Sequence, residues 1–256
     1  MPDLAYDLAG GATGTVIAPY YGTFAARPAA GSAGRLAFVT DSPIQTWVDD
    51  GSAWRPLING VIGTAPPAVA GMTWVNQGGA SATANNGAIA LVGVNDGAPP
   101  GQLRGKVLTN SASTAYAELG FAFQLYGDIT ASHFNGMYAW LRESATAKSY
   151  GLDCFQDFNS RRTTIQAEVW SSDSARTTNV DKGYVAGDPN QAFFTRVRRN
   201  GANLFAEVSR DRQTWIQVDT RTTASVFTTA PDQAGFACNG INCIAASNIF
   251  HFISGS

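Results

Sequence analysis

Alternation of apolar and polar side chains with a period of two is the feature that most constrains this chain. In residues 115–125, "AYAELGFAFQL", Leu119 and Phe121 share one side, whereas Glu118 and Gln124 share the other. A β-strand points successive side chains to opposite faces, while a helix repeats near every 3.6 residues. Similar runs recur at spacings of about 8–20 residues, and the pattern therefore predicts an all-β chain built as an antiparallel sandwich.

The strongest local prediction is a β-hairpin within residues 193–218. Asn200 and Gly201 lie between two alternating runs. Both residue types can adopt the positive φ that a type I′ turn requires. In the following run Leu204 and Ala206 are expected to share one face of a strand. Any helix in the chain is expected to be a single turn, for instance around residues 224–227.

Four segments are expected along the chain. Residues 1–22 contain several glycines and are expected to be an extended anchoring arm that needs a partner surface to become ordered. Residues 23–60 are expected to form a small β-meander module, because short apolar runs alternate there with turn residues. Residues 61–71 contain two adjacent prolines and are expected to be a linker. Residues 72–256 are expected to form the β-sandwich.

Composition limits the partners of the chain. Charged residues make up only 14% of the sequence and the net charge is −2, so no basic field attracts nucleic acid or an anionic membrane. No apolar run reaches the roughly 18–20 residues that a membrane-spanning helix needs, and no membrane insertion is expected. The first residues lack a secretory signal, and synthesis in a host cytoplasm is therefore expected.

The cysteines and histidines predict no cofactor. The chain has three cysteines and no C-x-x-C pair, which argues against a zinc or redox site. Neither His133 nor His251 has a second ligand at metal-binding spacing. The expectation is therefore that the protein binds no metal and no cofactor.

Residues 72–256 resemble jelly-roll domains of the concanavalin A-like lectin/glucanase type. The similarity lies in an Arg-rich strand, a turn, a second strand and a Ser-x-Asp-x-x-x-Trp turn. It is carried by Arg196, Arg198, Asn200, Gly201, residues 205–209, Asp211 and Trp215. The resemblance implies a jelly-roll fold, which hosts lectins, hydrolases and structural modules alike.

A hydrolase of this kind would need two carboxyl groups on either side of the bond that it cleaves. Related glucanases carry them on one strand as E-x-D-x-(x)-E, a string that this chain lacks. Its nearest acids are Asp153 and Asp157, with Glu118, Glu168 and Glu207 isolated on other runs. Glu118 and Glu168 are candidates for a concave groove, although a solvated strand face is the commoner explanation. The sequence therefore predicts no catalytic residues and no enzyme.

Residues 23–58 resemble the short β-module of phage tail and head-fibre proteins. The similarity lies in "GTFAARPAAGSAGRLAFVTD" followed by "TWVDDGSAWRPL". It implies an intertwined homotrimer in which Trp47, Val48 and Trp54 are buried between chains. The alternative is a peripheral hairpin of the sandwich, with both tryptophans packed within their own chain.

Carbohydrate recognition commonly combines an aromatic ring with planar polar side chains. The alternation in residues 137–142 places Tyr138, Trp140 and Arg142 on one face of a strand. Together with Arg161 and Trp170 they are the candidate glycan-binding residues. Because the opposite face is also apolar, the alternative is a central strand that is covered on both sides.

These observations favour a phage virion structural protein: a fibre, a spike or a capsid-decorating protein. Its N-terminal arm would attach it to other virion proteins, and its jelly-roll head would face outward and bind a host-surface polysaccharide. One alternative is a glycan-degrading enzyme on the same concanavalin A-like scaffold. Another is a free-standing bacterial lectin-like module.

Overall fold

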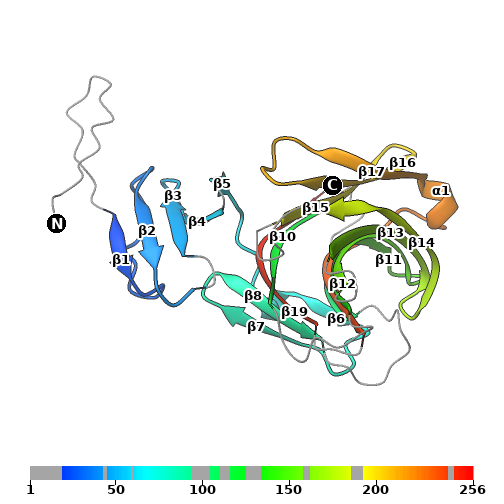
Figure 1. Cartoon of the computed structure of the whole chain (residues 1–256), viewed down its shortest axis with the longest axis horizontal. Coiled ribbons are helices and arrows are strands. Elements are labelled where there is room, and N and C mark those ends of the chain that lie inside the picture. The colour runs from blue at the N-terminus through cyan, green and yellow to red at the C-terminus, as the bar shows by residue number, and fades with distance from the viewer. Residues whose placement is uncertain are drawn as a thin grey trace.

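A computed structural model describes residues 19–42, 45–58, 60–93, 104–109, 116–124, 134–157, 162–185, 193–241 and 245–255. Nearly all of the regular structure within these ranges is β-strand, arranged in one small and two large sheets (Figure 1). The prediction of an all-β chain built from antiparallel sheets is confirmed. No helix in these ranges is long and apolar enough to span a membrane.

Sheet 1 is the small sheet at the N-terminal side, and its five strands follow chain order. Only β1 and β2 run parallel. Its strands are β1 (Tyr20–Gly22), β2 (Leu36–Val39), β3 (Thr46–Asp49), β4 (Trp54–Ile58) and β5 (Val61–Ile62). The last residues of the expected arm (1–22) and the first residues of the expected linker (61–71) thus pair within this sheet, as β1 and β5.

The two large sheets have seven strands each, and their pairing is antiparallel throughout. Sheet 2 has the order β17 (Ile216–Thr222), β16 (Asn203–Ser209), β15 (Phe193–Asn200), β10 (Tyr116–Gln124), β19 (Ala245–Gly255), β8 (Ala88–Gly93), β7 (Ser81–Asn85). Sheet 3 has the order β14 (Ala175–Val185), β13 (Arg162–Ser172), β12 (Lys148–Asp157), β11 (Phe134–Glu143), β18 (Gln233–Ile241), β9 (Arg104–Thr109), β6 (Thr73–Val75).

The main core lies between sheets 2 and 3. Alternate residues of β10, including Leu119 and Phe121, pack there against alternate residues of β11 and β12, including Leu141 and Leu152. The period of two is thus the direct cause of the sandwich, because it gives each strand one apolar face to bury. The opposite face of each large sheet does not contribute to this core.

The predicted hairpin is present, with one difference in its turn. Asn200 pairs with Asn203, so the two loop residues are Gly201 and Ala202. Of these only Gly201 has a positive φ, of 58°. A type I′ turn needs two such residues, so this hairpin uses another turn type. The predicted single helical turn is also present, as α1 (Thr223–Val226).

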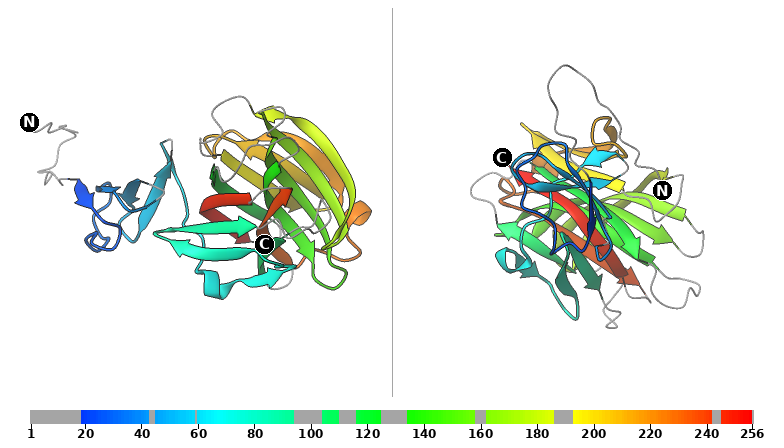
Figure 2. Two further views of the ribbon diagram at one scale, coloured as in Figure 1. Left: turned by 60° about the horizontal axis from the view of Figure 1, so that its bottom comes forward. Right: turned by 90° about the vertical axis from the view of Figure 1, so that its left-hand side faces the viewer.

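Sheet 1 packs on the outer face of sheet 2, beside the sandwich (Figure 2). Trp47 belongs to a cluster with Ala88, Phe194 and Phe250 of the sandwich, and only 1% of its surface is exposed. A side chain at Gly87 would overlap the Trp47 ring, so this close approach requires glycine there. The expectation that Trp47 is buried between chains is therefore corrected, since its own chain buries it.

Val48 and Trp54 lie in different surroundings from Trp47. Alternation along β3 turns Val48 to the opposite face of sheet 1, where it is half-buried. Trp54 is also half-buried, and its Nε1 donates a hydrogen bond of 2.8 Å to the carbonyl oxygen of Pro28. Trp54 thus also contacts its own chain, while its burial and that of Val48 between chains stay predictions, as does the homotrimer.

Candidate functional site

One face of sheet 3 gathers the aromatic and acidic side chains of the middle strands. We call it the acidic face and define it by Tyr138, Trp140, Asp153, Glu168 and Trp170. It is the face turned away from the main core, because the neighbouring positions on each strand point into that core. Tyr138 pairs with Asp153 across β11 and β12, while Trp140 and Glu168 both pair with Gly151.

Sheet 3 curls so that its opposite edges come together on the acidic side (Figure 1). Asn76, directly after β6, donates its Nδ2 to the carbonyl oxygen of Asp173 at 3.1 Å, and Asp173 lies in the β13–β14 turn. Arg142 of β11 donates to both carboxylate oxygens of Asp173 at 2.8 Å. These contacts hold the β13–β14 turn next to β6, which is at the opposite edge of the sheet. They help to explain why little of the acidic face is exposed to solvent.

Three of the five candidate glycan-binding residues come together on the acidic face. Tyr138, Trp140 and Trp170 form one buried cluster with Val75 and Ala237. Arg142 lies at the rim, bound to Asp173 and to Gln233. Arg161 lies outside the described residues. At most 1% of each of the three aromatic side chains is exposed, so both faces of β11 are covered, as the alternative interpretation anticipated.

Asp153 and Glu168 form a carboxyl pair that the sequence did not reveal. They are 3% and 0% exposed. Arg176 donates to Glu168 Oε1 at 2.7 Å, and Trp170 Nε1 donates to Oε2 at 2.9 Å. The Tyr138 hydroxyl acts to lower the pKa of both carboxyl groups, but burial outweighs it. Burial raises the pKa of each, and the charge of Glu168 raises that of Asp153 further.

Three polar atoms of this face are buried without a hydrogen-bond partner among the described residues: Trp140 Nε1, Ser149 Oγ and Asp153 Oδ1. Gly136 leaves room for the Asp153 carboxyl group, because a Cβ there would lie 2.7 Å from Asp153 Oδ1. Each unpartnered buried group costs about 1–3 kcal/mol, so native structures seldom keep one without a reason. Three on one face indicate a place where a ligand or ordered water supplies the missing bonds.

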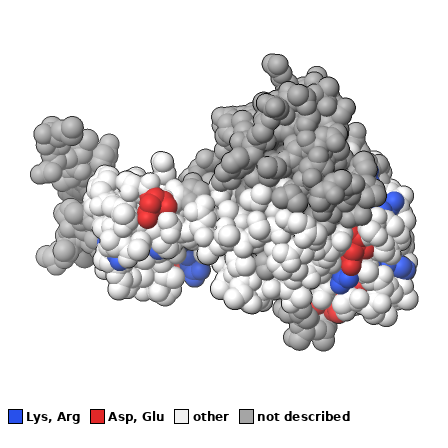
Figure 3. All heavy atoms as spheres, turned by 90° about the horizontal axis from the view of Figure 1, so that it is seen from below, with Lys and Arg blue, Asp and Glu red and all other residues white. Residues whose placement is uncertain are grey.

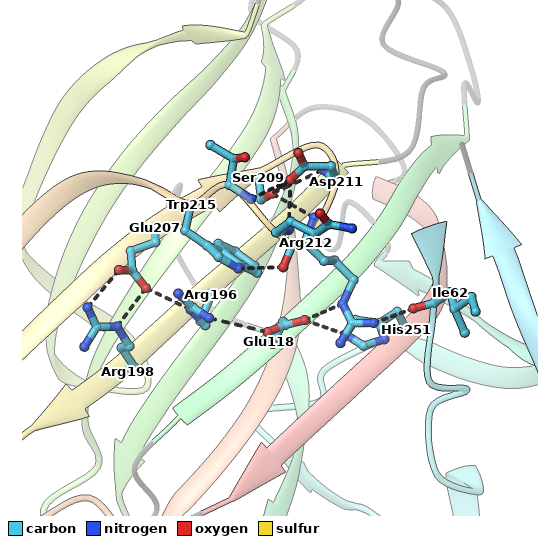
Figure 4. A network of polar contacts seen from close by, with 12 residues as sticks. Ile62, Glu118, Arg196, Arg198, Glu207, Ser209, Asp211, Arg212, Trp215 and His251 are labelled. Carbon is cyan, nitrogen blue, oxygen red and sulfur yellow. Dashed lines mark hydrogen bonds and ion pairs between the residues drawn. The ribbon is translucent and has the colours of Figure 1, made fainter. Parts of the chain in front are cut away.

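The outer face of sheet 2 carries a different arrangement, the ion-pair network (Figure 4). We define it as Glu118, Arg196, Arg198, Glu207, Arg212 and His251. Arg212 Nε and His251 Nε2 lie 2.7 Å and 3.0 Å from Glu118 Oε1. Arg196 and Arg198 both donate to Glu207, at 2.8 Å and 2.9 Å. Burial favours the neutral form of Glu118, but the bonds from His251 and Arg212 outweigh it and lower its pKa.

The network also fastens sheet 1 to the sandwich. Arg212, at a positive φ of 59°, donates to the carbonyl oxygen of Ile62. The backbone N–H of Thr64 donates to His251 Nδ1 at 2.7 Å, and Phe252 N donates to Thr64 O at 3.1 Å. Because Nδ1 accepts, neutral His251 carries its proton on Nε2 and donates it to Glu118. These bonds satisfy each carboxylate of the network, which indicates a structural role.

The expected groove between Glu118 and Glu168 is not present. Glu118 lies on sheet 2 and Glu168 on sheet 3, so the core separates them. Glu168 instead neighbours Asp153 across Gly151. Sequence reasoning missed the role of Gly151. Because glycine has no side chain, it leaves room beside β13 for the carboxyl groups of Asp153 and Glu168, which are not directly paired. No group of three or more His, Cys, Asp and Glu suited to a metal occurs within the described ranges.

Surface charge is sparse on the side of the molecule drawn in Figure 3, where the charged groups of the described residues are few and scattered. This agrees with the low charged fraction of the sequence. The described residues of that side therefore form no broad charged patch. The ion pairs described above are instead buried, on the faces of sheets 2 and 3 that lie opposite the main core.

No protein-family model and no curated protein matches the chain. Solved structures do resemble it. A carbohydrate-binding module from Bacillus subtilis has a TM-score of 0.45 at 9% identity, covering 73% of this chain and 96% of its own. A β-glucanase from Bacillus licheniformis has a TM-score of 0.47 at 8% identity, covering 75% and 95%. A lichenase from a mouse hindgut metagenome has a TM-score of 0.46 at 10% identity, covering 75% and 95%.

At such low identity the likeness concerns architecture alone, and the sandwich itself rests on the strand pairing described above. Two sequence-based interpretations nevertheless change. The exclusion of an enzyme is wrong as it was made, because similar structures include glycoside hydrolases as well as a binding module. Nothing in these similarities supports the phage-virion interpretation. The antiparallel sandwich that the resemblance implies is confirmed by the strand pairing of sheets 2 and 3.

Proposed function

We propose that this protein binds a neutral carbohydrate on the acidic face of sheet 3. The observation that carries the proposal is the set of three unpartnered polar atoms beside tryptophan rings. Trp140 Nε1 is a donor, Asp153 Oδ1 is a carboxyl oxygen and Ser149 Oγ both donates and accepts. Sugar hydroxyls donate and accept equally well, so the hydroxyls of a carbohydrate can satisfy all three types of group.

The rest of the face fits the same class of ligand. The rings of Tyr138, Trp140 and Trp170 are buried, and once the β13–β14 turn is displaced they can offer apolar surface to the C–H face of a sugar. The one guanidinium beside this carboxyl pair, that of Arg176, is already bound to Glu168, so an anionic sugar would find no free positive charge there. Because Asp173 ties the β13–β14 turn to Asn76 and Arg142, entry of a ligand requires these bonds to separate.

The test is binding of soluble neutral polysaccharides and their oligosaccharides to the full chain, measured by isothermal titration calorimetry. Trp140→Phe keeps an aromatic ring and removes the unpartnered N–H, and we expect about tenfold weaker binding, the worth of one hydrogen bond. Trp215→Phe, on the other sheet, is the matched control and is expected to bind as the wild type does. Equal affinity of a folded Trp140→Phe variant, or no binding to any polysaccharide, would reject the proposal.

Hydrolysis of the bound glycan is a second candidate function. The observation that favours it is the Asp153–Glu168 pair, since glycoside hydrolysis uses two carboxyls with unequal proton affinity. Release of reducing ends from the same polysaccharides is the measurement. Asp153→Asn and Glu168→Gln are each expected to abolish release, whereas Glu118→Gln is expected to retain it at a temperature where that variant is folded. If both variants still release reducing ends, hydrolysis by the Asp153–Glu168 pair is rejected, and carbohydrate binding remains the only proposed function of this face.

A further inference from the structure

The turn between β13 and β14 crosses part of the acidic face. Arg142 of β11 pairs with Ser149 of β12, which in turn pairs with Trp170 of β13. Directly paired residues point to the same face of a sheet, so these three side chains form one row across sheet 3. Asp173, just beyond Trp170, accepts two hydrogen bonds of 2.8 Å from Arg142, although β13 and β11 lie about 10 Å apart. The turn therefore reaches over β12 and covers Ser149, whose Oγ is buried and unpartnered among the described residues.

Irregular pairing of β13 with β14 bends the hairpin at the base of this turn. Val169 pairs with Thr178, whereas the next residue of β13 pairs with Arg176. Thr177 is therefore an extra residue on β14, and such a β-bulge bends its strand and increases the local twist. The Thr177 hydroxyl donates to the carbonyl oxygen of Val169 at 3.0 Å, which holds the bulge in place. The long strands below the bulge stay paired whatever the position of the turn above it.

Beyond the bulge, the contacts of Asp173 hold the turn against the sheet. Its carboxylate binds Arg142, and its carbonyl oxygen accepts a hydrogen bond of 3.1 Å from Asn76 Nδ2. A neighbouring serine bonds within the hairpin instead, since Ser171 Oγ donates to the carbonyl oxygen of Ala175 at 3.2 Å. The side chain of Asp173 is 24% exposed, so water and salt can compete for its ion pair.

We propose that residues 171–175 form a lid over the acidic face and that Asp173 is its latch. When the latch separates from Arg142 and Asn76, the turn lifts about the bulge and exposes Ser149. The role of the lid rests on the proposed function: a carbohydrate binds the open form alone, so the closed form lowers the apparent affinity in proportion to the fraction of open molecules. Loss of the latch should therefore strengthen binding, whereas loss of a group that contacts the carbohydrate weakens it.

Opening is measured without any ligand, by the rate at which a thiol reagent labels Ser149→Cys in the full chain. The same chain without this substitution gives the background from the native cysteines. Adding Asp173→Asn keeps the shape of the latch and removes its charge, and we expect labelling about tenfold faster, because hydrogen bonds between charged groups are the stronger ones. Higher salt should speed labelling only while Asp173 is present. Equal labelling rates with and without Asp173→Asn would overturn the inference.

Asp211→Asn is the matched control for this measurement. Asp211 also lies in a turn, but on sheet 2, and it accepts hydrogen bonds from Gln213 N and Thr214 N within that turn. Its replacement is expected to leave the labelling of Ser149→Cys unchanged. An acceleration as large as that caused by Asp173→Asn would mean that general loosening of the fold, and not a lid, exposes this position.

Binding of neutral polysaccharides to Asp173→Asn, in the chain with native Ser149, tests the role of the lid. Labelling and binding both depend on the open fraction, so we expect the affinity measured by calorimetry to rise by about the same factor as the labelling rate. Weaker binding would show that Asp173 contacts the carbohydrate, and equal binding that entry bypasses the turn, and either result overturns this role. If labelling accelerates but no polysaccharide binds to either chain, the proposed function fails and the lid stands.

Discussion

The two large sheets each bury acidic side chains on the face opposite the shared core, yet they treat them in opposite ways. Glu118 and Glu207 of sheet 2 are each 5% exposed, and Arg196, Arg198, Arg212 and His251 surround them. Asp153 and Glu168 of sheet 3 are less exposed still, with one arginine between them. Similar burial therefore does not imply similar pKa values, because the hydrogen-bond and ion-pair partners determine the free-energy cost of burying a charge.

The pKa directions express this difference. Burial pushes every one of these pKa values upward, but hydrogen bonds from arginine and histidine reverse the result for Glu118 and Glu207. For Asp153 and Glu168 burial prevails. A carboxylate with enough partners holds the fold together, as Glu118 does where sheet 1 meets the sandwich. A carboxyl without them is a candidate for chemistry.

Matched amide substitutions should separate the two regions most strongly. We expect Glu118→Gln to lower the free energy of unfolding by about 2–3 kcal/mol, because Arg212 and His251 lose a charged acceptor. Asp153→Asn should leave it unchanged or raise it, because an amide neither buries a charge nor has to take up a proton on folding at this poorly partnered position. Urea unfolding at pH 7 measures both. A loss in Asp153→Asn as large as that in Glu118→Gln would contradict the comparison.

Sequence alone predicted the layers of this fold for a clear physical reason. Alternation in β10 and β11 assigns each residue to one of two faces, and the Gly201 hairpin fixes a local register. Both signals are local. The order of the strands in a sheet depends on pairings between distant segments, such as β10 with β19. That order was therefore beyond local patterns.

The candidate site was harder to predict because it needs register across three strands. Tyr138, Trp140 and Trp170 could be named from aromatic alternation. The pairing of Glu168 with Gly151, which brings it near Asp153, could not. The role of Trp47 was misjudged for a similar reason, since its cover comes from Phe194 and Phe250, far along the chain. The homotrimer, the virion location and the arm-bound virion partners stay predictions.

The pH dependence of stability should also have opposite signs in the two regions. Burial lowers the pKa of His251, which faces Glu118, Arg212 and the N–H of Thr64. Its contribution is therefore full above the unfolded pKa of about 6.5 and is lost as pH falls through the folded value. The raised pKa of Asp153 means the reverse: its contribution is full below about pH 3.9 and is lost as pH rises through the folded value.

Urea unfolding of variants at a series of pH values measures these contributions. At pH 7, His251→Asn is expected to have a lower free energy of unfolding than the wild type. When the pH falls from 7 to 5, its free energy of unfolding is expected to decrease less than that of the wild type. Asp153→Asn is expected to gain stability relative to the wild type as pH rises above about 3.9. Identical pH profiles for all three proteins would show that neither buried group is linked to folding.

The smallest effect is expected within the ion-pair network itself. Arg198 has a side chain that is 31% exposed, and Glu207 keeps Arg196 at 2.8 Å when Arg198 is replaced. Arg198→Gln should therefore lower the free energy of unfolding by about 0.5 kcal/mol, which for a chain of this size is a melting-temperature shift of about 1–2 °C. Differential scanning calorimetry measures it. A shift several times larger would mean that Glu207 depends on both arginines, and the surplus of partners that distinguishes sheet 2 from sheet 3 would then be smaller than the contacts indicate.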